Sequence, residues 1–268
     1  MSESYVGDIV VMGAAGRMGR LIASLAAGEG LRLVGVLERP EFESHLVGYQ
    51  CETGSDARAM FSMFPKASVI DFTSPESSLA TAAVAQETGN PVVIGTTGFT
   101  AAQKDALQRM ALESPLFWAP NMSVGVNVLL EILPQLTRLL GEGYDLEMME
   151  IHHNKKKDAP SGTALRLAES MTEGRGWNLD EVACCKREGI VGERPHNEIG
   201  IQAIRGGDVA GVHTAYFIGQ GERIEVTHHA HSRENFAHGA LRAARWMQGR
   251  KPGKLYSMQD VLRDKANV

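Results

Sequence analysis

The fold is decided near the N-terminus by the stretch Ile9-Val10-Val11-Met12-Gly13-Ala14-Ala15-Gly16-Arg17-Met18-Gly19. Its first four residues form a short apolar run, which is typical of a buried strand. Three glycines follow in a G-x-x-G-x-x-G spacing, and beyond them Leu21, Ile22 and Leu25 recur at helical spacing. The stretch therefore predicts a strand, a glycine turn and a helix in direct succession.

Each glycine of this turn has a physical reason to lack a side chain. Gly13 permits the tight turn, Gly16 lets a pyrophosphate approach the backbone, and Gly19 lets the helix pack closely on the strand. The helix N-terminus would meet the phosphate charge. The spacing differs from the commoner G-x-G-x-x-G, and tight turns also occur without a ligand, so the turn alone leaves both interpretations open.

A second apolar strand, Leu33 to Leu37, ends in an acidic and a basic residue about 20 residues beyond the turn. Glu38 stands where an acidic group would bond the ribose hydroxyls of a dinucleotide, and the adjacent Arg39 could pair with a 2′-phosphate. This juxtaposition predicts the use of both NADH and NADPH. The alternative is an ordinary solvated charge pair.

Strands and helices continue to alternate beyond this point. Strands at Val69 to Phe72 and Val92 to Ile94 flank a helix from Pro75 to about Thr88, with the proline suited to the first helical position. Thr100 and Gln103 have the spacing of a capping box, which gives Thr100 a structural interpretation. The alternation is typical of a doubly wound parallel sheet.

Three loops after these strands are expected to border the cofactor, because open α/β sheets bind ligands beyond the carboxyl ends of their strands. They are Phe72-Thr73-Ser74-Pro75, Gly95-Thr96-Thr97-Gly98 and Ala119-Pro120-Asn121-Met122. Thr96 and Thr97 have no evident capping role, although turn formation would also explain them.

Composition narrows the class of protein. A chain of 268 residues with 43% hydrophobic residues can form two domains, and its net charge of −5 argues against nucleic acid and anionic membranes as partners. Three cysteines without metal-type spacing suggest neither disulfides nor zinc, which fits a reducing cytoplasm. We find no run of ~18 apolar residues and no signal-like N-terminus, so an unprocessed soluble protein is expected.

The second half follows a different pattern. A helix from about Val126 to Leu140, interrupted or kinked near Pro134, leads to a strand from Leu146 to Ile151. Three segments rich in β-branched and aromatic residues follow, joined by glycine-containing turns, which predicts antiparallel strands with hairpins. They are Ile199 to Arg205, Val212 to Ile218 and Arg223 to His229.

A chemically dense loop links the 146–151 strand to a helix expected from Thr163 to Met171. It reads His152-His153-Asn154-Lys155-Lys156-Lys157-Asp158-Ala159-Pro160-Ser161-Gly162-Thr163. A helix start with backbone N–H groups at Gly162 and Thr163 would hold one carboxylate of a substrate. His153 or Lys156 would contact another.

The same loop offers a proton donor. Hydride delivered to an electron-poor carbon leaves negative charge that needs a proton, and His152 is suited to supply it. The lysine run also has a plain interpretation as solvated charge, and Ser161 as a helix N-cap. Paired histidines suggest a metal, but adjacent strand residues point to opposite faces and no carboxylate or cysteine pair completes a ligand set, so no metal site is expected.

A second histidine group comprises His228, His229 and His231, near Arg233. Ordinary sheet-surface residues explain these histidines. Arg233 could still reach an anionic substrate.

These patterns define the fold class as α/β, with a Rossmann-type parallel-sheet domain and an α+β domain that has a mostly antiparallel open sheet. Residues 1–122 with 235–268 are assigned to dinucleotide binding, and residues 123–234 to substrate binding and oligomerisation. The final helix, about Asn235 to Met247, is expected to return to the first domain. Because an open sheet has edges that a partner subunit would cover, a homo-oligomer is expected.

Taken together, the motifs resemble the dihydrodipicolinate reductase family, also called 4-hydroxy-tetrahydrodipicolinate reductases, over nearly the whole chain. Beyond the glycine turn, the resemblance rests on Asp71-Phe72-Thr73, Gly95-Thr96-Thr97-Gly98-Phe99, Asn121-Met122-Ser123-Val124-Gly125-Val126-Asn127, and His152-His153 through Asp158-Ala159-Pro160-Ser161-Gly162-Thr163-Ala164. It implies a cytoplasmic, homotetrameric enzyme of the diaminopimelate route to lysine. Such an enzyme reduces dihydrodipicolinate, a cyclic imine dicarboxylate, to tetrahydrodipicolinate with NADH or NADPH.

The resemblance also implies residue roles. His152 becomes the proton donor and acceptor, Lys156 a proton donor, and His153 with Gly162 and Thr163 the carboxylate site. The implied cofactor contacts are Gly13, Ala14, Ala15, Gly16, Arg17, Met18, Glu38, Arg39, Gly95, Thr96, Thr97, Ala119, Pro120, Asn121 and Met122.

Two positions depart from some relatives. Ser74 replaces an arginine that would help to hold a 2′-phosphate, which puts a strong preference for NADPH in doubt. Met122 follows Asn121 where some relatives place an aromatic residue, so stacking against the cofactor is not assured.

Two other classes remain open on the sequence. One is a dehydrogenase of the amino-acid or aldehyde type with the same cofactor domain, although no cysteine nucleophile is evident in a loop facing the nicotinamide. The other is a non-catalytic regulator that binds NAD(P) and whose basic loop recognises a partner.

Overall fold

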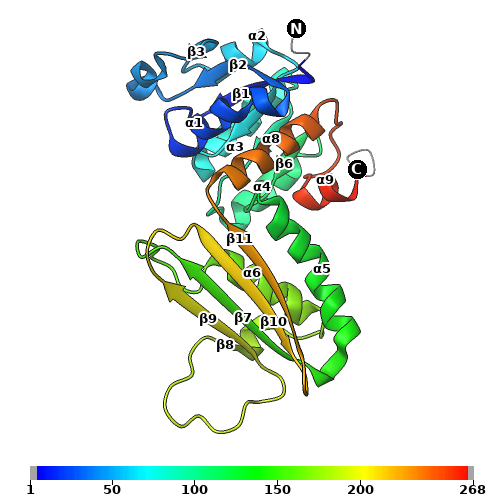
Figure 1. The fold of residues 1–268 in the computed structure, drawn as a ribbon. Coiled ribbons are helices and arrows are strands. Elements are labelled where there is room, and N and C mark those ends of the chain that lie inside the picture. The colour runs from blue at the N-terminus through cyan, green and yellow to red at the C-terminus, as the bar shows by residue number, and fades with distance from the viewer. Residues whose placement is uncertain (1–4, 265–268) are drawn as a thin grey trace. The chain divides into compact units, whose positions relative to one another are not determined.

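A computed structural model describes residues 5–264, which form two compact units (Figure 1). The first unit combines the chain before Gly125 with the chain from Glu234 onward, and the second unit is Gly125–Arg233. The first unit is therefore discontinuous in sequence.

Within the described residues, the first unit contains a six-stranded parallel sheet of order β3-β2-β1-β4-β5-β6. Its strands are β1 (Gly7–Met12), β2 (Leu31–Leu37), β3 (Glu52–Gly54), β4 (Ser68–Asp71), β5 (Val92–Ile94) and β6 (Leu116–Trp118). The strand order reverses on either side of β1, which is the point where doubly wound sheets bind dinucleotides. The predicted Rossmann-type sheet is confirmed.

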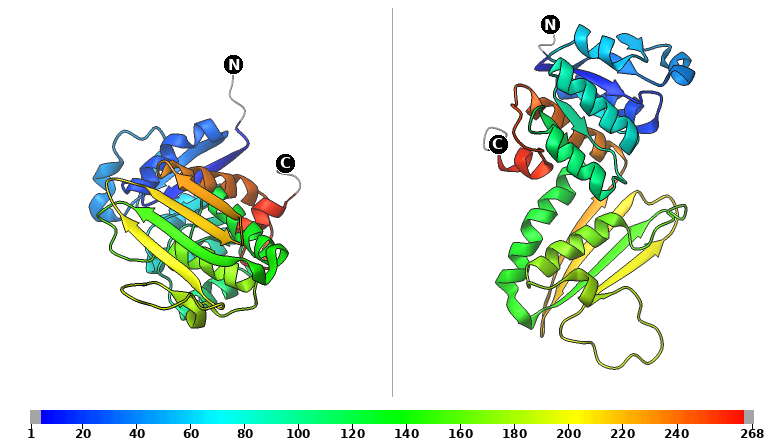
Figure 2. Two further views of the ribbon diagram at one scale, coloured as in Figure 1. Left: turned by 60° about the horizontal axis from the view of Figure 1, so that its bottom comes forward. Right: turned by 180° about the vertical axis from the view of Figure 1, so that it is seen from behind.

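Helices cover both faces of this sheet (Figures 1 and 2). They are α1 (Arg17–Leu25), α2 (Ala57–Met63), α3 (Pro75–Thr88), α4 (Ala101–Met110), α8 (Glu234–Met247) and α9 (Met258–Arg263), with 3₁₀ turns η1 (Ala27–Glu29) and η2 (Pro40–Leu46). Successive strand residues point to opposite faces, so Ile9 and Val11 join the core beneath α1 and α8, while Val10 joins the core beneath α2, α3 and α4. All three side chains are fully buried.

Local sequence signals fix several helix boundaries in this unit. Pro75 opens α3, which ends at Gly89 in the left-handed conformation, and Thr100 with Gln103 forms the predicted capping box of α4. Strand β3 and helix α2 were not predicted, because the three residues of β3 are polar or small and carry no apolar run.

The second unit, all of whose residues are described, has a five-stranded mixed sheet of order β11-β10-β7-β9-β8. Its elements are α5 (Val124–Leu140), η3 (Gly141–Gly143), β7 (Asp145–His152), α6 (Gly162–Glu173), α7 (Leu179–Val182), β8 (Ala183–Cys184), β9 (Ile199–Arg205), β10 (Gly211–Ile218) and β11 (Arg223–Ala230). One apolar core joins α5 and α6 to alternate residues of β7, β9 and β10. The sheet thus has one face covered by helices.

The pairing within this sheet corrects one prediction. Strands β10 and β11 form the expected hairpin, but β9 pairs with β7 in parallel and does not pair with β10. The central strand β7 lies between β9 and β10, so the residues 206–210 form a crossing loop and not a hairpin turn. This loop passes over the end of β7, where Gly206 N–H donates to the His152 carbonyl and His153 N–H donates to the Val209 carbonyl.

Helix α5 runs through Pro134 without the predicted interruption. Together with η3 it is long and apolar enough, by length and composition, to cross a membrane. Its buried residues Val126, Leu129 and Leu133 belong to the core of the second unit.

Candidate active site

The glycine turn in the first unit leaves no room for side chains. Gly13 adopts a left-handed φ of 64°, and a Cβ added to Gly19 would lie 2.3 Å from the Gly13 carbonyl oxygen and 2.7 Å from the Ala14 Cα. A Cβ on Gly16 would lie 3.1 Å from the same carbonyl oxygen. The two later glycines therefore let α1 start directly against the turn.

Helix α1 begins without a side-chain cap. Its N-cap is Gly16, and no side chain accepts a hydrogen bond from its first turn, which also lacks acidic residues. By contrast, Ser74, Thr100 and Ser161 cap α3, α4 and α6 with their hydroxyls. The uncapped α1 offers backbone donors and a positive dipole end to an anion, which fits a dinucleotide pyrophosphate.

Glu38, at the end of β2, reaches back to the turn. One carboxylate oxygen accepts from Ala15 N–H at 3.1 Å and the other from Arg39 N–H at 3.0 Å. Arg39 itself is exposed, pairs with Glu41 at 3.3 Å and lies 4.8 Å from the ring centroid of Phe42. An acidic and a basic group are thus both present beside the turn, as ribose and phosphate recognition require.

The loops after β4 and β5 are tied together by a buried polar network. Asp71 is fully buried, and its Oδ1 accepts from the backbone and hydroxyl of Thr73 and from the Ser78 hydroxyl. Ser78 in turn shares a 2.7 Å hydrogen bond with the Thr96 hydroxyl. Thr96 therefore has a structural role that the sequence did not reveal, whereas the neighbouring Thr97 is exposed.

The loop after β6 contributes mainly backbone. The side chains of Ala119 and Met122 are buried in the core beneath α1 and α8, and Pro120 is exposed. The Asn121 side-chain oxygen accepts from Ser123 N–H at 2.9 Å, which shapes the turn before α5. A ligand at this loop would meet peptide groups and the Asn121 amide.

The second unit places a glutamate and a histidine on one buried face of β7. Burial alternates along the strand, and Leu146, Met148, Glu150 and His152 are the buried residues. Glu150 is fully buried, and 11% of the His152 side chain is exposed. The apolar start of the strand anchors it in the core, and its end carries the polar pair.

The Glu150 carboxylate is the centre of the polar cluster. It lies 2.5 Å from His152 Nδ1, accepts from Ser161 N–H at 3.0 Å, and receives two guanidinium hydrogen bonds of 2.7 Å from Arg205. Burial alone would raise the pKa of Glu150, but the hydrogen bonds from Arg205 and His152 outweigh it and hold that pKa below its usual range. The carboxyl is therefore ionised at neutral pH.

A second buried histidine lies beside this pair. His213 Nε2 is 3.2 Å from the Ser161 hydroxyl, and its ring centroid is 5.2 Å from that of His152. Burial, with the repulsion of nearby His152, lowers the pKa of His213 from 6.5 to about 4. His213 is therefore neutral at physiological pH.

The remaining loop residues divide into half-buried and exposed. Lys156 pairs with Asp158 at 2.9 Å and is 21% exposed, and its hydrogen bond holds the pKa of Asp158 below its usual range. His153 is half-buried, and its Nδ1 is buried with no hydrogen-bond partner among the described residues. Lys155 and Lys157 are exposed, as expected of solvated charge.

At the start of α6, Ser161 accepts from Ala164 N–H at 3.1 Å, while Gly162 is exposed and Thr163 is half-buried. The predicted residues His152, His153 and Lys156 thus lie in the loop that enters this helix start. On the sheet, His228 is paired with His213 in the β10–β11 register, so it lies nearer the cluster than a plain surface residue would.

Three residues of this cluster escaped the sequence analysis: Glu150, Arg205 and His213. They come from three strands, and Arg205 lies 55 residues beyond Glu150 in the chain. The signal that could have found Glu150 was the alternation Leu146, Met148, Glu150, which puts a carboxylate on the buried face of β7.

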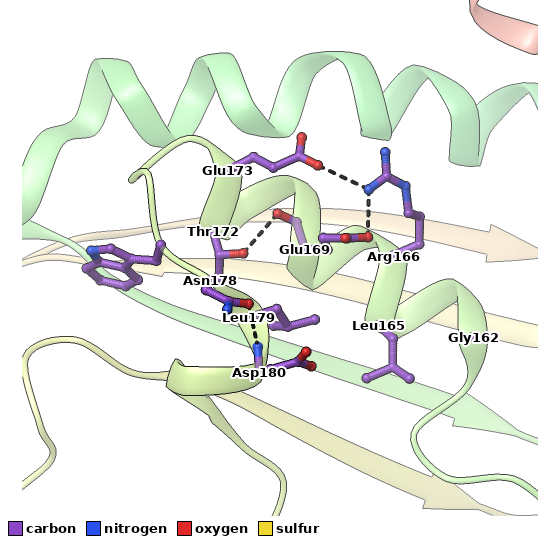
Figure 3. A pocket seen from close by; sticks show the side chains of 10 residues that line it. Gly162, Leu165, Arg166, Glu169, Thr172, Glu173, Asn178, Leu179 and Asp180 are labelled. Carbon is purple, nitrogen blue, oxygen red and sulfur yellow. Dashed lines mark hydrogen bonds and ion pairs between the residues drawn. The ribbon is translucent and has the colours of Figure 1, made fainter. Parts of the chain in front are cut away.

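A pocket of about 450 Å³ lies on the outer side of α6 and α7 (Figure 3). Three of its charged groups are paired, since Arg166 donates to both Glu169 and Glu173. Neither a histidine nor a lysine lines this pocket. Gly162, near the end of the His152 loop, lines this pocket, whereas His152, His153 and Lys156 do not.

Among residues 5–264, no group of three or more His, Cys, Asp and Glu side chains could hold a metal ion. The strand order and the glycine turn are typical of enzymes that bind dinucleotides at the switch point of the sheet. The fold and the turn together define a protein of the Rossmann-type, dinucleotide-binding class.

Comparison with known proteins identifies the family. The model described as "Dihydrodipicolinate reductase, N-terminus" matches residues 8–122, and that described as "Dihydrodipicolinate reductase, C-terminus" matches residues 125–262. The chain belongs to the dihydrodipicolinate reductase family.

Curated relatives extend over the same length. The 4-hydroxy-tetrahydrodipicolinate reductase of Nitratidesulfovibrio vulgaris is 62% identical over 255 residues, which cover 95% of this chain and 98% of the relative. The enzyme of the same name from Lawsonia intracellularis is 56% identical, with 95% and 99% coverage. That from Citrifermentans bemidjiense is 47% identical over 264 residues, with 95% and 98% coverage.

Solved structures support the fold. The dipicolinate-bound dihydrodipicolinate reductase of Paenisporosarcina sp. TG-14 matches with a TM-score of 0.74 at 22% identity, covering 93% of this chain and 97% of that one. An amine dehydrogenase from Mycobacterium smegmatis matches with a TM-score of 0.61 at 10% identity, covering 92% and 94%. At this identity the likeness concerns the fold alone.

Proposed function

We propose that this chain reduces 4-hydroxy-tetrahydrodipicolinate (dihydrodipicolinate) to tetrahydrodipicolinate with NADH or NADPH, in the diaminopimelate route to lysine. The relatives named for this reaction cover nearly the whole chain. The observation that carries the proposal is the second unit's loop, in which a carboxylate-bound histidine leads into an exposed helix start. Such a loop suits a substrate that needs both a proton and carboxylate recognition.

The first unit, residues 1–122 with 235–268, is assigned to the cofactor. When bound, the reduced nicotinamide supplies a hydride to the substrate. The uncapped start of α1 would hold the pyrophosphate, and the loops after β5 and β6 would border the nicotinamide half. The proposed contacts are Gly13, Ala14, Ala15, Gly16, Arg17, Met18, Glu38, Arg39, Gly95, Thr96, Thr97, Ala119, Pro120, Asn121 and Met122.

Use of both cofactors follows from the pair Glu38 and Arg39. Glu38 could exchange its contact with Ala15 N–H for ribose hydroxyls of NADH, since it is only half-buried. Arg39 would hold the 2′-phosphate of NADPH. Ser74, whose hydroxyl caps α3, adds no positive charge there, which favours tolerance of both over strict NADPH use.

The second unit, residues 123–234, is assigned to the substrate. His152 would donate the proton through Nε2, because its Nδ1 is held by Glu150. Lys156 would serve as a further proton donor and as positive charge beside the ring.

Two carboxylates of the substrate need two anchors. The start of α6, with Gly162 and Thr163, would hold one carboxylate through backbone N–H groups and the threonine hydroxyl. His153 would hold the other. Dipicolinate, a cyclic dicarboxylate, is the molecule named in the solved relative from Paenisporosarcina, and it has the chemistry that these anchors require.

We further propose a cytoplasmic homotetramer without nucleic-acid or membrane partners. Strand β11 is eight residues long, exposed at several positions, and pairs only with β10 within the second unit. A long unpaired edge of this kind is normally covered by another chain. The oligomer would be checked by light scattering, which should give a mass four times that of the monomer.

One assay tests the reaction. The purified chain is supplied with substrate made in situ by the preceding synthase, and oxidation of NADH and NADPH is followed by absorbance. Turnover with both cofactors is expected. Cofactor binding without oxidation would support the non-catalytic regulator instead, and turnover of amino acids or aldehydes in place of the imine would support another dehydrogenase.

A further inference from the structure

We propose that Glu150 is a positioning residue for the reaction, because one buried carboxylate fixes both the His152 ring and the backbone at the start of α6. The inference rests on the proposed function. It assigns Glu150 and its partner Arg205 a role that neither the sequence patterns nor the roles given above include.

The two oxygens of the Glu150 carboxylate contact different parts of the site. Oε2 lies 2.5 Å from His152 Nδ1, and Oε1 accepts from Ser161 N–H at 3.0 Å. The two oxygens of a single side chain thus reach the proton donor and the residue that caps the carboxylate-binding helix. A movement of Glu150 would displace both parts of the site together.

The Glu150 side chain is itself held in place by Arg205. Arg205 binds it bidentately from β9, with both bonds at 2.7 Å, and the same guanidinium donates to the Asp158 carbonyl at 2.6 Å. Bidentate guanidinium–carboxylate pairs combine charge with fixed geometry. Arg205 therefore fixes Glu150 and also the loop that carries Lys156.

Glu150 also determines which ring nitrogen of His152 carries a proton. An ionised carboxylate only accepts hydrogen bonds, so Glu150 requires a proton on Nδ1 of His152. This leaves Nε2 as the nitrogen that faces a substrate and can carry the transferred proton.

The charged and titratable groups around this pair come from every neighbouring element. They are Arg205 on β9, His213 on β10, His228 on β11, and Lys156 and Asp158 in the loop. His213 is neutral near pH 7, because burial lowers its pKa to about 4. Among these groups, Glu150 alone supplies negative charge directly to the His152 ring.

The same strand provides a matched control. Glu147 also binds arginines, with Arg187 at 2.7 and 2.9 Å and Arg194 at 3.1 Å, but it touches no histidine. Substituting Glu147 removes a comparable carboxylate–guanidinium pair from β7. A decrease in kcat that is caused only by impaired folding should therefore appear in both variants.

The experiment compares Glu150→Gln with Glu147→Gln in steady-state kinetics over pH, using fractions with the oligomeric state of the wild type. A glutamine amide at Glu150 would offer an N–H to Nδ1 and favour the opposite tautomer. We expect kcat of Glu150→Gln to fall about 10²- to 10³-fold, the range of a lost general acid. The pH profile of kcat should change as well, because the His152 ring loses the ionised carboxylate that lies 2.5 Å from its Nδ1.

For Glu147→Gln, kcat should stay within about threefold of the wild type, as for surface changes remote from the site, with an unmoved pH profile. Equal kcat and an equal pH profile in the two variants would overturn the positioning role. If the wild type itself failed to reduce the imine, the proposed function would fail, and that outcome is distinct.

If Glu150→Gln does not fold, Glu150→Asp takes its place, because it keeps the charge and shortens the side chain by one methylene. Its kcat should fall about tenfold or more as the contact with Nδ1 lengthens, while the pH profile stays near that of the wild type. Wild-type kcat in a folded Glu150→Asp would overturn the proposal.

Discussion

Glu38 and Glu150 each accept a backbone hydrogen bond just ahead of a helix, yet the two are held very differently. Glu38 accepts from Ala15 N–H, is half-buried, and forms no salt bridge with an arginine of residues 5–264. Glu150 accepts from Ser161 N–H, is fully buried, and is clamped by Arg205. One carboxylate can exchange its partner for a ligand, and the other cannot.

The contrast extends to the helices that they precede. The start of α1 lacks side chains, since Gly13, Gly16 and Gly19 leave room around the turn and no side chain caps the helix. The start of α6, by contrast, is built from side chains, since Ser161 caps the helix and buried polar residues bond to Ser161. A site for a large, common cofactor needs room, whereas a site for proton transfer needs fixed side chains.

The largest effect should come from His152, the proposed proton donor, in the loop that leads to α6. His152→Gln is expected to lower kcat about 10³-fold, because the variant keeps a polar side chain but has no titratable group. Steady-state kinetics would measure it, with the exposed His229→Gln as control. Full turnover in His152→Gln would remove the acid role.

The buried histidine behind Ser161 should make stability depend on pH. Between pH 6.5 and 4 the unfolded chain gains a proton at His213 that the folded chain does not, so the free energy of unfolding decreases as pH falls. Over the whole window this amounts to about 3 kcal/mol. Urea unfolding at several pH values should show a smaller decrease for His213→Gln than for wild type, and identical slopes would contradict the burial argument.

In the first turn of α1, Gly19→Ala places a Cβ against backbone atoms that cannot move away. We expect a loss of about 2 kcal/mol in stability, the cost of overpacking, together with weaker cofactor binding. Thermal unfolding and fluorescence titration with NADPH would measure both. Gly28→Ala is the control, since a Cβ there meets nothing within 4 Å.

A smaller effect is expected at the substrate end of α6. Thr163→Val removes a hydroxyl from the carboxylate anchor, so the substrate KM should rise about tenfold, as for one lost hydrogen bond to a charged group, with kcat less affected. Thr227→Val on β11 removes a sheet-surface hydroxyl and serves as control. A fall in kcat with unchanged KM would assign Thr163 to the chemistry instead.

The smallest effect should separate the two cofactors. Arg39→Ala is expected to raise the KM for NADPH about fivefold through loss of an exposed phosphate contact, while the KM for NADH stays the same. Arg32→Ala, near the opposite end of β2, is the control. Equal changes in KM for both cofactors would show that Arg39 does not contact the 2′-phosphate.

The sequence predicted best what is encoded locally. The strand, turn and helix around Gly13 fall within 19 residues, and the first turns of α3 and α4 are marked by Pro75 and Thr100. Periodicity and capping depend on neighbours in the chain, so a single sequence displays them.

The features that the sequence did not predict depend on residues that come into contact only in the folded sheet. The partner of Glu150 comes from β9, and β9 itself pairs in parallel with β7 although the glycines after it resemble a hairpin turn. Likewise the hydrogen bond between Thr96 and Ser78 gives Thr96 a structural role beside its proposed cofactor contact, and the two residues come from different elements. Strand pairing over such separations leaves no periodic trace in one sequence.

The loop 206–210 that crosses the end of β7 bears on the order of folding. It can bond His152, His153 and Asn154 only after β9 and β10 have both joined the strand between them. These contacts span some 50 residues of chain and carry a large loop-closure entropy, so they are expected to form late. During synthesis the proton-donating loop would thus acquire its shape after the strands around it, and a chain arrested before Gly206 would carry the glycine turn without a working acid.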